Sequence, residues 1–101
     1  MKQVTIKAGD LESESCTLAH WKLGTVFVPP VSGDQFRVEI FGSHDKKEFG
    51  PIDDGLAFYT QERYSVHSFD PQVFAGIQFI KFFLNQPAPI DLEFHVHLID
   101  S

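Results

Sequence analysis

Residues 90–98 read Ile-Asp-Leu-Glu-Phe-His-Val-His-Leu, a strict alternation of apolar and polar side chains. Because successive side chains of a β-strand point to opposite faces of a sheet, this run predicts a strand with one buried and one hydrated face. Residues 35–42 repeat the pattern, with Phe36, Val38 and Ile40 on the apolar side. The period of two that these runs share predicts a protein built from strands.

Two more segments are rich in strand-forming residues. Residues 23–28 stop at the proline pair 29–30, because proline has no backbone N–H to donate to a ladder. Residues 78–84 are mostly apolar on both sides, so we expect them to form a central strand with a neighbour on each edge.

The remaining strand candidates are shorter. Residues 56–60 and 64–67 flank a short polar connection, and we expect them to pair as a β-hairpin. Residues 4–7 and 15–18 carry weaker strand patterns and are separated by a charged turn.

The helix signal lies at residues 70–76. Asp70 is a suitable N-cap, Pro71 suits the first helical position and Gly76 is a stop signal, which leaves room for about one turn. About seven or eight short strands, with turn signals between them, predict an all-β fold, an antiparallel, jelly-roll-like β-sandwich. We expect residues 1–101 to form a single β-sandwich domain.

Charge and cysteine content exclude several classes of protein. Fourteen acidic and eight basic residues give a formal net charge of −6, which disfavours nucleic acid as a partner. No apolar run approaches the roughly 20 residues that span a bilayer, so we expect no membrane contact. The lone Cys16 cannot close an internal disulfide and is expected to be a small buried apolar residue rather than a nucleophile.

His95 and His97 lie two residues apart, so both imidazoles share one face of the predicted strand, a spacing that many metal sites use. A metal needs further ligands from another element, and we favour a solvated or interface-facing polar strand surface instead. Ser43-His44-Asp45 has the residue types of a hydrolase triad, but consecutive residues cannot converge as a relay.

The acidic loop 44–55 holds four carboxylates that could suit calcium, yet it lacks EF-hand spacing and is interpreted as a bare loop. Because no other motif in the chain indicates a catalytic or ligand-binding site, we expect no enzyme activity, no catalytic residue, no cofactor and no metal.

Phenylalanine is the unusual residue, with 11 copies in the chain. Strand periodicity assigns many of these rings to the core, but it leaves over Phe41, Phe49 and one side of the 78–84 strand. Phe74 is interpreted as a plug that closes the core, or as an exposed anchor. Trp21 either caps the end of the core or presents a ring to a sugar or a protein. The candidate protein-interface residues are therefore Trp21, Phe41, Phe49 and Phe74.

Residues 70–81 read Asp-Pro-Gln-Val-Phe-Ala-Gly-Ile-Gln-Phe-Ile-Lys. This segment resembles the pattern Asp-Pro-x-x-Phe-Ala-Gly-x-x-x-(Ile/Leu)-Lys of small β-sandwich virion structural proteins of tailed bacteriophages, of the capsid decoration or cement type. The resemblance spans about residues 3 to 99 and includes the 23–30 segment and the strand that enters Ser43-His44-Asp45.

The resemblance implies a decoration protein on the virion capsid surface, made in the host cytoplasm. Its partners would be the major capsid protein and further copies of itself, as a trimer or dimer. Trp21, Tyr59 and Tyr64 motivate an alternative, a carbohydrate- or receptor-binding module on the virion. A third hypothesis is a cupin-like metal enzyme built on His95 and His97.

Overall fold

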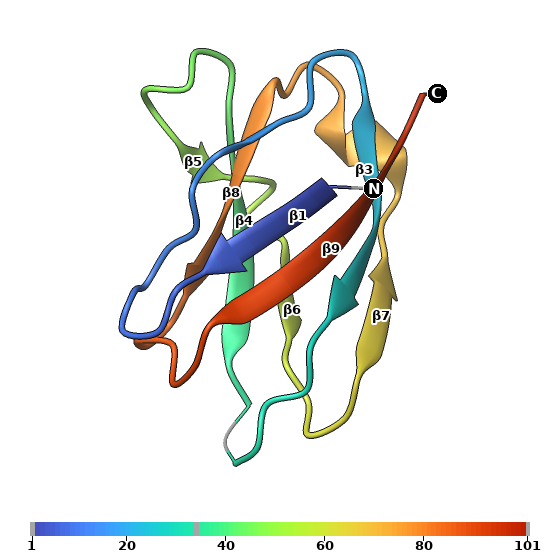
Figure 1. The fold of residues 1–101 in the computed structure, drawn as a ribbon. Coiled ribbons are helices and arrows are strands. Elements are labelled where there is room, and N and C mark those ends of the chain that lie inside the picture. The colour runs from blue at the N-terminus through green and yellow to red at the C-terminus, as the bar shows by residue number, and fades with distance from the viewer. Residues whose placement is uncertain (1, 34, 101) are drawn as a thin grey trace.

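The computed structural model describes residues 2–33 and 35–100. Two antiparallel sheets pack against each other, and in Figure 1 β1 and β9 cross in front of β4 and β8. The four-stranded sheet has the order β1 (Lys2–Ile6), β9 (Leu92–Ile99), β3 (Lys22–Val28), β7 (Ser65–Ser68). The five-stranded sheet has the order β2 (Cys16–Thr17), β8 (Phe79–Leu84), β4 (Arg37–Ser43), β5 (Gly50–Pro51), and β6 (Ala57–Tyr59) also pairs with β4. The predicted all-β sandwich is confirmed.

The strands pair as a nested series. The first strand pairs with the last, β1 with β9, and the following pairs are β2 with β8, β3 with β7 and β4 with β6. A long antiparallel ribbon that is rolled into two sheets has these pairings, which define a jelly roll. The jelly-roll-like topology predicted from the sequence is therefore present, with β5 as a two-residue addition beside β4.

Alternation along the strands places the core between the sheets. In β9, Leu92, Phe94 and Val96 are fully buried, while the residues between them are exposed. The rings of Phe82 and Phe94 meet edge to face across the two sheets, 5.2 Å apart between centroids, and Phe58 packs against both. The burial of these rings accounts for part of the high phenylalanine content.

Strand β8 has β2 on one side and β4 on the other, as its two-sided apolar pattern predicts. Its residues Ile80, Phe82 and Leu84 face the core, which turns Phe79 and Phe83 outward.

The predicted hairpin of residues 56–60 and 64–67 is wrong, because β6 and β7 belong to different sheets. Thr60, the residue after β6, is buried and makes two hydrogen bonds to Phe36. Its N–H donates to the Phe36 carbonyl at 3.0 Å, and its Oγ1 accepts from the Phe36 N–H at 2.9 Å. The polar connection then crosses to the other sheet, where the Gln61 carbonyl accepts from the Val31 N–H. A polar linker between two strands fits such a crossing as well as it fits a hairpin.

The predicted helical turn is a 3-10 helix, η1 (Pro71–Phe74). The Asp70 side chain caps it by accepting from the Gln72 N–H at 3.0 Å, and Gly76 follows with a positive φ of 83°. In the part of the chain described by the structure, no helix is long and apolar enough to cross a membrane.

Candidate protein-binding face

Four phenylalanine rings lie on the outer side of the five-stranded sheet, where the core does not cover them. They are Phe41 on β4, Phe49 in the loop after β4, and Phe79 and Phe83 on β8, and all four are partly exposed. We call this set the aromatic face. Its rings come from two adjacent strands and one loop, so β4 and β8 position it.

Phe41 and Phe83 form the centre of the aromatic face. Their centroids lie 4.3 Å apart, with the ring planes tilted by 37°. The two residues are diagonal neighbours, because Phe41 pairs with Lys81 and Phe83 pairs with Glu39 across the ladder. An aromatic pair of this kind contributes about 0.5–1.5 kcal/mol beyond its buried area. The pair therefore forms a fixed apolar surface.

Lys81 lies between the two outward rings of β8 and joins the loop to the sheet. Its Nζ atom lies 4.9 Å from the centroid of Phe49 and donates a hydrogen bond to Glu12 Oε1 at 3.1 Å. The side chain is 24% exposed, so its aliphatic stem covers apolar surface while the ammonium group is compensated. Phe49 is thereby held against the aromatic face.

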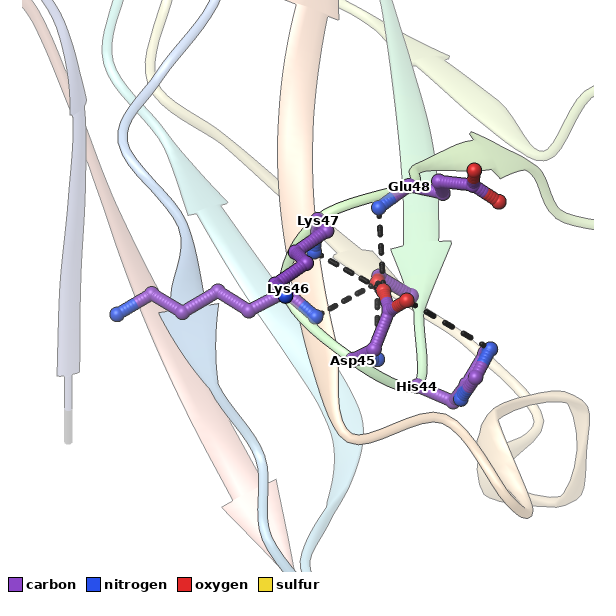
Figure 2. A network of polar contacts seen from close by, with 6 residues as sticks. His44, Asp45, Lys46, Lys47 and Glu48 are labelled. Carbon is purple, nitrogen blue, oxygen red and sulfur yellow. Dashed lines mark hydrogen bonds and ion pairs between the residues drawn. The ribbon is translucent and has the colours of Figure 1, made fainter.

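The loop after β4 is organised by two short polar side chains (Figure 2). Asp45 Oδ1 accepts from the backbone N–H groups of Lys47 and Glu48 and from Ser43 Oγ, and Ser43 Oγ accepts from the Lys46 N–H. The two backbone N–H groups, with the Ser43 hydroxyl, lower the pKa of Asp45 to about 2. The loop is thus fixed by an ionised carboxylate.

This loop also places a second cation at the aromatic face. Lys46 Nζ lies 6.0 Å from the centroid of Phe79, and Lys46 itself adopts a positive φ of 68°. Lysines therefore approach the aromatic face at two places, although the chain as a whole carries a net charge of −6.

The structure distributes the four predicted interface residues among three environments. Phe41 and Phe49 belong to the aromatic face. Phe74 is only 1% exposed, so its assignment as an interface residue is wrong. The ring closes the core, as the plug interpretation expected, because η1 turns it inward against β3. Phe79 and Phe83 were missing from the candidates, since a strand that is apolar on both sides does not reveal which side faces out.

Trp21 lies apart from the aromatic face and is 40% exposed. Its ring packs against that of His20, with centroids 4.9 Å apart. It borders a hollow of about 360 Å³ that also involves Lys2, Thr17 and His97, and Lys2 Nζ donates to the Thr17 carbonyl at 2.8 Å. The hollow combines an aromatic ring with the Lys2 ammonium group and the His97 imidazole.

The residues considered for chemistry do not converge. His95 and His97 are exposed on the outer face of β9, away from the core between the sheets. No group of three His, Cys, Asp or Glu side chains within residues 2–33 and 35–100 is arranged to hold a metal. Ser43 Oγ donates to Asp45 rather than to His44, so these three residues form a turn and not a relay.

Cys16 is buried on β2, as expected, and is a free thiol. Burial raises the pKa of this thiol, and Lys2 lowers it by a smaller amount. The neutral thiol is therefore favoured, which is the opposite of what a nucleophile needs.

Comparison with known proteins found no matching family model, no matching curated protein and no matching solved structure.

Proposed function

We propose that this chain is a bacteriophage virion structural protein, a decoration or cement subunit that binds the major capsid protein and stabilises the shell. The aromatic face is the observation that carries the proposal, because four partly exposed phenylalanines on one side of a small domain suit burial against another protein. The resemblance of residues 70–81 to phage decoration proteins supplies the identity of the partner.

The aromatic face has the composition of a protein contact. Aromatic residues are enriched at the buried centres of interfaces, where a few anchors carry most of the binding energy. Phe41 and Phe83 are already packed against each other, so little side-chain entropy is lost when a partner covers them. A subunit that binds only the mature shell stabilises it by mass action, and the effect is repeated at every site on the capsid.

The first experiment is mass spectrometry of purified virions, with copy number, from the phage whose genome carries this sequence. Hundreds of copies per particle support a shell protein. Absence of the chain from virions would refute the proposal, and a handful of copies would point to a tail or connector part.

The second experiment tests the contact surface by co-sedimentation with expanded capsids. Phe79→Glu places a charge in the aromatic face and should weaken binding by at least about tenfold, which corresponds to 1.4 kcal/mol. Ile90→Glu makes the same change at a residue that is 52% exposed in the connection before β9, and it should bind as the wild type does. Equal binding by both variants, each with an unchanged melting temperature, would exclude the aromatic face as the contact.

The Trp21 hollow favours a second candidate, a carbohydrate- or receptor-binding module. An exposed indole ring can stack on the apolar face of a sugar, and the Lys2 ammonium group could attract an acidic group. A glycan array tests this candidate: binding that Trp21→Ala abolishes would support it, and a wild-type chain that binds no glycan would remove it.

A further inference from the structure

Strand β7 lies at the end of its sheet and is paired with β3 on one side only. Figure 1 shows β7 at the outer margin of the molecule. A free edge offers unpaired backbone N–H and C=O groups to another strand, and proteins usually protect such edges with charged residues, proline or very short strands.

The other edge strands that the structure describes carry such protection. Strand β1 begins at Lys2, so a lysine lies within the strand itself. Strands β2 and β5 are two residues long, β5 includes Pro51, and β6 has three residues. Strand β7 has four residues, Ser-Val-His-Ser, and contains no Asp, Glu, Lys, Arg or proline.

Exposed apolar side chains accompany this free edge. Val66 is 51% exposed and Tyr64, just before β7, is 58% exposed. The Tyr64 ring stacks beside Phe27 of β3 at 6.3 Å between centroids, so the apolar surface continues from the edge onto the sheet. A β-branched residue with half its surface in water at an unprotected edge is typical of a strand that pairs with another chain.

We propose that two copies of this chain pair through β7, edge to edge and antiparallel, so that their four-stranded sheets become continuous. The charges favour a second copy as the occupant. Each chain carries −6, and β7 contains no Asp, Glu, Lys or Arg, so two copies can meet along this strand without opposing carboxylates.

Twofold symmetry also matches the exposed side chains. In an antiparallel pair related by a twofold axis perpendicular to the sheet, each side chain keeps its face, so Tyr64 and Val66 meet the same two residues of the second copy. The contact between the two copies requires no capsid, so it can be tested independently of the proposed virion role.

Sedimentation equilibrium tests the proposal with the purified chain. We expect a concentration-dependent mass that approaches twice 11.5 kDa. Val66→Lys, at an exposed position, should raise the dimer dissociation constant at least about tenfold, since an edge lysine opposes strand pairing. The matched control, Gln3→Lys, adds the same charge at the other edge of the same sheet and should leave the dimer unchanged.

Hydrogen exchange gives a second measurement, in which the amides of β7 should become more protected as protein concentration rises while those of β1 do not. A wild-type chain that stays monomeric at every concentration, or a dimer that Val66→Lys and Gln3→Lys affect equally, would overturn the proposal. If β7 pairs only with a different protein, the purified wild-type chain will stay monomeric, which is the first of these two outcomes.

Discussion

The ammonium group of Lys81 lies 4.9 Å from the centroid of the Phe49 ring and also bonds Glu12 at 3.1 Å. One side chain thus links the loop after β4, strand β8 and the segment before β2. Because the group is partly exposed, its energy is modest, and the contact serves mainly to keep Phe49 in the aromatic face.

Replacing Lys81 with Gln should lower the free energy of unfolding by about 0.5–1 kcal/mol, since the cation–π contact and the ion pair are both lost. Urea unfolding measures this change. Lys81→Arg keeps a cation over the ring and should unfold close to the wild type. If Gln and Arg have equal effects, the charge does not contribute.

The low pKa of Asp45 predicts that part of the free energy of unfolding is lost in acid. Its pKa is about 2 in the folded chain, against an ordinary value of 3.8. The carboxylate therefore contributes stability that is complete above pH 3.8 and is lost as the pH falls towards 2. The stability difference between the wild type and Asp45→Asn should shrink over that range. An NMR titration that placed the Asp45 pKa near 3.8 would contradict the network in Figure 2.

Gly42 and Gly50 face each other across the β4–β5 pair, yet they should respond differently to alanine. A Cβ atom at Gly42 would lie 3.0 Å from Ile77 Cγ2 and 3.2 Å from Ile52 Cγ1, whereas nothing lies within 4 Å at Gly50. We expect Gly42→Ala to destabilise the protein by about 1 kcal/mol or more through overpacking. Gly50→Ala should be neutral or slightly stabilising. Thermal unfolding of the two variants decides this, and equal melting temperatures would show that the isoleucines move aside without cost.

Cys16 should resist thiol reagents in the folded protein, because burial both blocks access and raises the pKa of the thiol. Labelling by a disulfide reagent should be slow in native buffer and fast in denaturant. Rapid native labelling would mean that β2, only two residues long, opens readily from β8.

The strand pattern was readable from the sequence wherever one face is buried. Residues 92–98 alternate as expected, and the proline pair after Val28 marks the end of β3. The pairing of 56–60 with 64–67 was wrong, because local pattern does not say whether a polar link turns back or crosses between sheets. The contact that decides it, between Thr60 and Phe36, joins residues far apart in sequence.

The aromatic face was only partly predictable. Phe41 and Phe49 could be found as rings left over from the strand pattern. Phe79 and Phe83 could not be separated from their neighbours on β8, because both sides of that strand are apolar and only the packing of Phe82 against Phe94 decides which side is inside.

The nested pairing of the jelly roll also constrains when the chain can fold. Strand β9 lies between β1 and β3, so the four-stranded sheet lacks its centre until residues 92–99 have left the ribosome. Contacts between segments so distant in sequence slow folding, because a large loop must close before any of them forms. Nascent chains would expose the apolar sides of β1 and β3 throughout synthesis, a period in which chaperone binding or early association with another copy could decide the yield of folded protein.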